Sequence, residues 1–164
     1  MQHTQHGDHR DSAMHPYRKL AWMTALMFVA MYVLMYAMVD RFANAYSNLN
    51  QVYMSALMTG AMAAIELAIM RHMYPNRARN VLILALCALG LGIGWVGIRQ
   101  QVGIGDRQFL RSMIPHHAGA LLMCGEASIS DPRIHALCRD IRASQQREIE
   151  LMEELLENPK APSQ

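Results

Sequence analysis

Three long runs of apolar residues occupy most of the first hundred positions of the chain. Two of them, 20–39 and 81–98, contain no charged side chain, and the third, 52–73, contains only Glu66 and Arg71. A helix needs about 20 apolar residues to cross the hydrocarbon core of a bilayer. The pattern therefore predicts three transmembrane helices, one in each run.

After the third run, the apolar positions follow the spacing of amphipathic helices. Asp106 can cap a first helix that runs to about Ala127. Ser130-Asp131-Pro132 is a start signal for a second helix, which ends before Asn158. The inward positions of this second helix alternate in steps of four and three: Ile134, Cys138, Ile141, Gln145, Glu148, Met152 and Leu155. Because a short loop joins the two helices, we expect an antiparallel hairpin.

Folding this hairpin about residue 131 predicts which side chains meet. Cys124 falls opposite Cys138, His117 opposite Gln145, and Met113 near Glu148. The polar residues of one helix thus face those of the other. A buried polar group without a partner costs about 1–3 kcal/mol, so the histidine must be satisfied. Hydrogen bonding and a shared metal ion both remain open.

Pro115 and the two adjacent histidines are the unusual features of the first hairpin helix. Proline inside a helix removes a backbone hydrogen bond and is expected to kink the helix beneath His116 and His117. Neighbouring residues point about 100° apart on a helix, so one of the two histidines can face outward. An ordinary hydrogen-bonded pair and a metal-binding pair are both compatible with this pattern.

The segment before the first run has no apolar periodicity and is predicted to be disordered. His3, His6 and His9 recur at every third residue, and His15 follows them. This pattern is typical of loose metal capture, and a tail rich in histidine by chance is the alternative. The predicted fold is all-α. Its regions are a tail over 1–19, a transmembrane region over 20–98, a hairpin over 106–157 and a short tail over 158–164.

Lysine and arginine are distributed unevenly around the predicted spans. The tail and the second loop carry six, and the opposite side carries four. Because cytoplasmic loops collect these residues, we expect the N-terminus in the cytoplasm and the hairpin outside, in the periplasm of a bacterial inner membrane. The first run is too long for a signal-peptide core and is interpreted as an uncleaved anchor. A net charge of +2 does not favour nucleic acid as a partner.

The chain is rich in methionine, with 15 residues in 164, and many of them form stripes at four-residue spacing. The stripes comprise Met23, Met27, Met31, Met35 and Met38 in the first span, and Met54, Met58, Met62, Met70 and Met73 in the second. Methionine packs as readily as other apolar residues. It also suits Cu(I) and Ag(I), so a thioether-lined path is the alternative. Glu66 continues the second stripe, where it faces a cavity or bonds to a tyrosine or serine of another span.

Glycine and cysteine add weaker signals. Gly90 and Gly94 form a Gly-xxx-Gly pair that suits close helix packing, within the chain or between copies. Cys87 lies in an apolar run and is interpreted as a packing residue. Cys124 and Cys138 are expected to form either a disulfide or a pair of thiolate ligands. The sequence contains no nucleophile–base pair and no cofactor motif, so we expect neither an enzyme nor an organic cofactor.

Two stretches carry a resemblance to a known family. FLRSMIPHHAGALLMC and the later QQREIELM resemble the DUF305 family, whose hallmarks are Met-Ile-Pro-His-His on one helix and Gln-x-x-Glu-Ile-x-x-Met on the next. The resemblance implies a ferritin-like helical domain of bacteria, linked to copper or silver binding and resistance. Ala118 stands where the family often has glutamine. The implied metal-site residues are Met113, His116, His117, Met123, Gln145, Glu148 and Met152.

The combined expectation is an inner-membrane protein that binds Cu(I) or Ag(I) on its hairpin and supports copper or silver handling. Periplasmic metal-handling proteins and the lipid bilayer are its expected partners. An oligomeric Cu(I) transporter that uses the methionine stripes is one alternative, since the three spans are also similar in outline to eukaryotic CTR-type copper transporters. A structural membrane protein without metal is the other.

Overall fold

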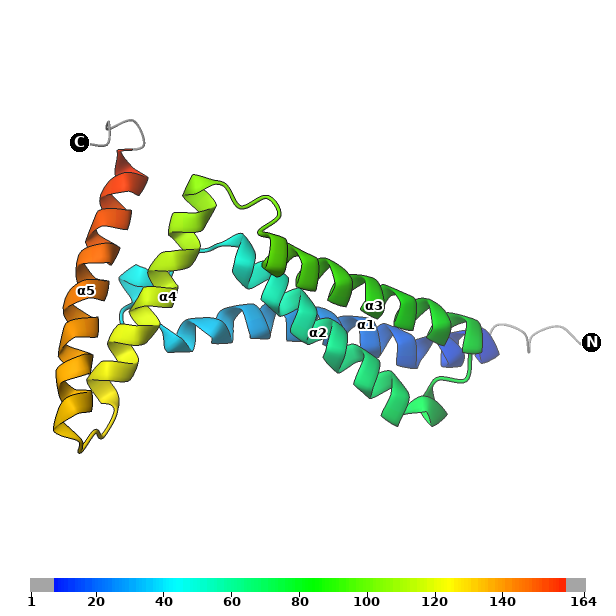
Figure 1. Ribbon diagram of the computed structural model, residues 1–164. Coiled ribbons are helices and arrows are strands. Elements are labelled where there is room, and N and C mark those ends of the chain that lie inside the picture. The colour runs from blue at the N-terminus through cyan, green and yellow to red at the C-terminus, as the bar shows by residue number, and fades with distance from the viewer. Residues whose placement is uncertain (1–7, 159–164) are drawn as a thin grey trace, which may run out of the picture. The chain divides into compact units, whose positions relative to one another are not determined.

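The computed structural model describes residues 8–158, with side chains from Pro16 onward. It confirms the all-α prediction, because the described residues contain helices and no strand. Within the described residues, five α-helices follow one another (Figure 1): α1 Asp8–Leu34, α2 Leu49–Ile69, α3 Arg77–Gln100, α4 Asp106–Glu126 and α5 Pro132–Glu157. Three short 3-10 helices join them: η1 Met35–Met38, η2 Phe42–Asn44 and η3 Arg71–Met73.

The chain divides into two compact units, which are described separately. The membrane unit contains α1 up to Val33 and the segment Val52–Val102. The hairpin unit contains Leu34–Gln51 and the chain from Gly103 onward. Each unit therefore combines parts that are distant in the sequence.

Within the described residues, three helices are long and apolar enough to cross a membrane, over Pro16–Met38, Leu49–Ile69 and Arg77–Gln100, and most of each belongs to the membrane unit. These match the three predicted spans, although each boundary moves by one to four residues. Most of their surface is exposed within the chain, as expected of helices that face lipid.

Glycines set the contact between α2 and α3. A Cβ added to Gly94 would lie 2.8 Å from the carbonyl oxygen of Tyr53, and one on Gly97 would lie 2.8 Å from the Tyr53 ring. A Cβ on Gly90 would meet no atom within 4 Å. The expected Gly90/Gly94 pair is therefore divided, because Gly94 packs inside the chain and Gly90 faces open space. The pair as a whole is not available for an interface between copies.

Helix α1 begins at Asp8, so the predicted disordered tail is wrong for residues 8–19. Contacts of Tyr17 support the part of this extension that lies next to the apolar run. The Tyr17 hydroxyl donates to Asn80 Oδ1 at 2.8 Å and accepts from the Asn76 amide at 3.1 Å. Its ring centroid lies 5.2 Å from that of Tyr74. These contacts extend the helix beyond its apolar run.

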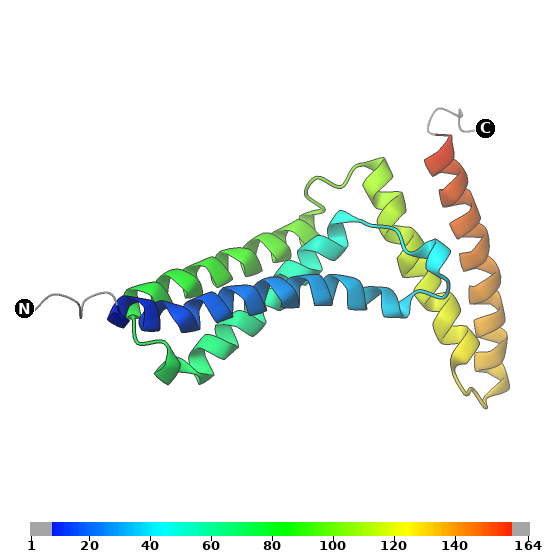
Figure 2. The same ribbon diagram turned by 180° about the vertical axis from the view of Figure 1, so that it is seen from behind.

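The hairpin unit is built on α4 and α5, which lie side by side and antiparallel (Figures 1 and 2). Ile114, Ala118, Leu121, Ile149 and Met152 form its buried core. Helix α5 starts as predicted, with the Asp131 side chain accepting from the Arg133 amide at 2.8 Å. The expected cap on α4 is wrong, since Gly105 is the N-cap and Asp106 lies in the first turn. There its negative charge still interacts favourably with the positive end of the helix dipole.

The segment between α1 and α2 forms a third layer on the hairpin, which the sequence did not predict. Val39 and Tyr46 pack against the hairpin core. The Leu49 amide donates to Gln108 Oε1 at 3.0 Å. A Cβ on Gly119 would lie 3.3 Å from the Met38 carbonyl oxygen, so glycine lets this backbone approach α4 closely.

Candidate metal centre

His117 is the best-positioned of the expected site residues. It lies on α4 and is only 7% exposed. Its Nδ1 is 2.9 Å from the carbonyl oxygen of Met113, one turn earlier on the same helix. Its Nε2 is 2.7 Å from Glu148 Oε2 on α5. The ring is thus held at both nitrogens and joins the two helices of the hairpin.

Glu148 is held in place by a second residue of its own helix, α5. Its Oε1 accepts from the Ser144 hydroxyl at 2.7 Å, four residues earlier on the same helix. The pKa of Glu148 is held below its ordinary value, mainly by the hydrogen bond from the Ser144 hydroxyl and secondly by the one from His117. The Glu148 side chain is 48% exposed, whereas that of His117 is 9% exposed. The carboxylate therefore stands between the buried imidazole and solvent.

The partners of His117 restrict its protonation states. Both ring nitrogens face oxygen acceptors, so a doubly protonated imidazolium satisfies both. In the neutral ring, Nδ1–H donates to the Met113 carbonyl and leaves the Nε2 lone pair toward Glu148. A backbone carbonyl on one nitrogen is a common way to orient the other nitrogen toward a metal.

The structure corrects the predicted register at the site. His117 faces Glu148 and not Gln145, three residues further along α5. The register near the turn is as predicted, because Cys124 pairs with Cys138. The long histidine and glutamate side chains reach along the helix axes, and a residue-by-residue pairing neglects that reach. In the observed register, Met113 and Met152 lie one turn beyond this pair on α4 and α5.

The other expected ligands differ in their surroundings. Met113 is half-buried against the hairpin core, and Met152 is part of that core. Gln145 is half-buried, while His116 and Met123 are exposed. One histidine of the pair therefore faces outward, as predicted. Across residues 8–158, no three His, Cys, Asp or Glu side chains form a group that could hold a metal ion.

Ser144 was missed by the sequence interpretation. Its signal was available, because a serine four residues before a glutamate on a helix can donate to the carboxylate. Ser144 was overlooked because it lies beside the inward positions of the second hairpin helix, from which the partners of the histidines were predicted.

The two hairpin cysteines form a disulfide. Cys124 and Cys138 are bonded, with their Cα atoms 5.3 Å apart. Of the two expectations for this pair, the structure contains the disulfide. Cys87 is a buried free thiol in α3, in agreement with its interpretation as a packing residue.

The methionine stripe of α2 lies on the outside of the membrane unit. Met54, Met58 and Met62 are 36–45% exposed. The buried face of the same helix carries Ser55, Thr59, Ala63 and Leu67 instead. Met27, Met31, Met35 and Met70 are half-buried. The methionines of α2 therefore do not line an internal path within a single chain. A thioether path along α2 would need a second chain to cover it.

Glu66 accepts a hydrogen bond from a tyrosine, but Tyr74 follows the span that carries Glu66 and does not belong to another span, as the simpler explanation had expected. The Tyr74 hydroxyl donates to Glu66 Oε1 at 3.3 Å. The pKa of Tyr74 is raised, mainly because the hydroxyl is buried and secondly because the negative charge of Glu66 lies nearby.

The tail histidines are only partly described. His3 and His6 lie outside the described residues. His9 and His15 belong to α1, but their side chains lie outside the described part of the structure.

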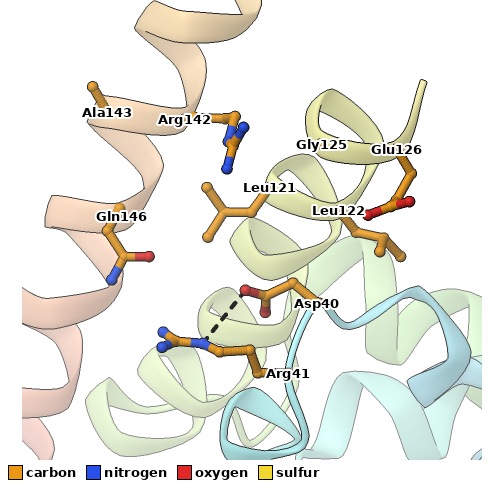
Figure 3. Close-up of a pocket in the computed structure, with 9 residues that line it drawn as sticks. All are labelled: Asp40, Arg41, Leu121, Leu122, Gly125, Glu126, Arg142, Ala143 and Gln146. Atoms are coloured by element: carbon orange, nitrogen blue, oxygen red, sulfur yellow. Dashed lines mark ion pairs between the residues drawn. The ribbon is translucent and has the colours of Figure 1, made fainter. Parts of the chain in front are cut away.

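A pocket of about 530 Å³ opens on another part of the hairpin unit (Figure 3). Its charged lining is mixed, with Arg142 and Glu126 beside an Asp40–Arg41 ion pair at 3.5 Å. None of the expected metal-site residues lines it. It is therefore separate from the candidate centre.

Fold and site together define an all-α protein with three potential membrane-spanning helices and a disulfide-linked hairpin. Residues 100–164 match the family described as Domain of unknown function (DUF305). Uncharacterized protein L153 of Acanthamoeba polyphaga mimivirus is 34% identical over 116 residues, which cover 69% of this chain and 74% of that protein. The chain belongs to the DUF305 family. The viral similarity is longer than the segment 100–164, so it extends into the membrane unit. No solved structure matches.

Proposed function

We propose that this protein binds a single Cu(I) or Ag(I) ion at His117 and supports the handling of that metal at a membrane. The supporting observation is the orientation of the buried His117 ring. The Met113 carbonyl fixes Nδ1, and Nε2 points across the hairpin to Glu148 at 2.7 Å. Nε2 would bind the ion once the Glu148 carboxylate moves away from it, while the Met113 carbonyl keeps the ring oriented.

The surrounding donor set favours a soft ion. Met113 and Met152 both lie one turn beyond the His117–Glu148 pair, on the same side of it, and would supply thioether sulfur. Imidazole with thioether suits Cu(I) and Ag(I), whereas carboxylate-rich sites suit harder ions. Glu148 either stays close to the bound ion or turns into solvent, toward which it is already half exposed. Gln145 and Ser144 support the site, and His116 and Met123 lie at its periphery.

The location belongs to the same proposal. Disulfides persist in oxidising compartments, so the Cys124–Cys138 bond supports a hairpin on the non-cytosolic side of the membrane. The Lys/Arg distribution favours the same orientation. We propose a bacterial inner membrane with a periplasmic hairpin that exchanges metal with other proteins there, and no enzymatic step.

A competition titration tests the metal site. The full chain in detergent, kept oxidised, is titrated with Cu(I) against a chromophoric chelator. His117→Ala is expected to lower the affinity roughly tenfold or more, the scale of losses when a metal site loses a supporting group. His116→Ala, the exposed neighbour, is the matched control and is expected to keep the affinity. Equal binding by His117→Ala and the parent would exclude this site, and no binding by the parent would favour a structural protein.

The exposed methionine stripe of α2 supports a second candidate, an oligomeric Cu(I) transporter. Met54, Met58 and Met62 are 36–45% exposed, and a second copy would cover this exposed part. Cu(I) flux into proteoliposomes tests this function. Flux that is lost in Met58→Leu/Met62→Leu but kept in His117→Ala would favour transport along the stripe over binding at the hairpin.

A further inference from the structure

The cysteine pair lies on the hairpin at a different place from His117. Cys124 is seven residues after His117 on α4, and Cys138 is on the facing part of α5 near the turn. Both cysteines are half-buried, so solvent, reductants and small ions can reach them. Their Cα atoms are 5.3 Å apart.

Reduction of this bond would leave the two thiols facing each other. The register of α4 and α5 has other supports, because the buried core runs through Ile114, Leu121 and Ile149. The Asp131 cap fixes the start of α5, and the hydrogen bond from His117 to Glu148 joins the helices further along. Two thiols held in this way need little ordering to share a ligand, which favours binding.

We propose that reduced Cys124 and Cys138 form a second soft-metal site, which binds one Cu(I) or Ag(I) ion between two thiolates. Thiolate sulfur is the softest protein ligand and selects Cu(I) among the common ions. Two facing sulfurs complete a linear site for such an ion, whereas zinc usually takes four ligands. This proposal uses none of the residues proposed to bind metal at His117 and does not rest on that function.

The chemistry has two balanced steps. A phosphine or dithiol reductant supplies two electrons, the S–S bond breaks, and two protons complete the two thiols. Cu(I) then replaces both thiol protons, giving one copper bis-thiolate with a net charge of −1 and releasing two protons. The copper stays in the +1 state, so the binding step needs no further oxidant or reductant. The disulfide form cannot bind in this way, since neither sulfur is a thiolate.

The test compares oxidised and phosphine-reduced full-length protein in detergent, in a Cys87→Ser background that removes the remaining thiol. Cu(I) is added against a chromophoric chelator, and ultraviolet thiolate-to-copper charge transfer is recorded. Reduction is expected to add one equivalent of bound copper together with the charge-transfer band. His117→Ala is expected to keep this added equivalent, so failure at either site is distinguishable from failure at the other.

Cys124→Ser/Cys138→Ser is expected to lose both the added equivalent and the band. If this variant does not fold, as judged by circular dichroism, iodoacetamide alkylation of the reduced parent replaces it and should give the same loss. An unchanged copper stoichiometry on reduction would overturn the proposal. So would an added equivalent that persists after the cysteines are replaced or alkylated.

Discussion

At the scale of single residues, His117 and Glu148 form a close polar pair in which only one partner is buried. The histidine is enclosed by the hairpin, and the carboxylate remains half exposed. Exposed ion pairs contribute little to stability because solvent screens them. The pair is therefore better suited to orienting a nitrogen than to stabilising the fold.

Protonation of Glu148 should weaken this pair. Its folded-state pKa is lowered by Ser144 and His117, so the stability that it contributes is fully present above the ordinary value of 4.5. That contribution is lost as the pH falls from there through the folded pKa. We expect the full chain in detergent to lose thermal stability over this acidic range. The Glu148→Gln variant should lose less stability over the same range than the parent. Glu154→Gln, an exposed carboxylate on the same helix, is expected to follow the parent. Identical acid profiles for Glu148→Gln and the parent would contradict the role of the pair.

At the scale of helices, hydrophobic patterning predicted the five α-helices, but not the start of α1, the short 3-10 helices or every contact between elements. The three apolar runs and the start signal at Asp131-Pro132 correspond to observed helices, because spans and caps depend on local sequence. The partner of His117 was misplaced by three residues, because side-chain reach is not encoded in spacing. The layer formed by Val39 and Tyr46 could not be predicted, since its packing depends on a segment distant from the hairpin in the chain.

Gly94 and Gly90 provide a matched test of how α2 and α3 pack. Gly94→Ala would place a methyl group 2.8 Å from the Tyr53 carbonyl oxygen, so we expect a loss of about 1–3 kcal/mol, typical of overpacking. Gly90→Ala meets no atom within 4 Å and should keep or slightly raise the stability, because alanine favours helices. Denaturation of the full chain in mixed detergent micelles measures both. Equal stability of the two variants would contradict the packing of Gly94 against α2.

At the scale of the whole molecule, the proposal requires the hairpin and the N-terminus to lie on opposite sides of a membrane, because three spans separate them. The disulfide and the Lys/Arg distribution favour an external hairpin. We expect alkaline phosphatase fused after Gln164 to be active in bacterial cells, since that enzyme needs an oxidising compartment. A fluorescent protein that matures only in the cytoplasm should stay dark at the same position. The reverse result would place the hairpin in the cytoplasm.

The direct measurement of the proposed centre is copper X-ray absorption on the Cu(I)-loaded full chain, oxidised and carrying Cys87→Ser so that no free thiol contributes sulfur. We predict one imidazole nitrogen together with thioether sulfur around the copper. Met113→Leu/Met152→Leu should lose the sulfur signal, since leucine keeps the packing volume but removes the donor. Met123→Leu, an exposed control, should leave it unchanged. A sulfur signal that persists in Met113→Leu/Met152→Leu, or a spectrum without imidazole, would contradict a centre at His117.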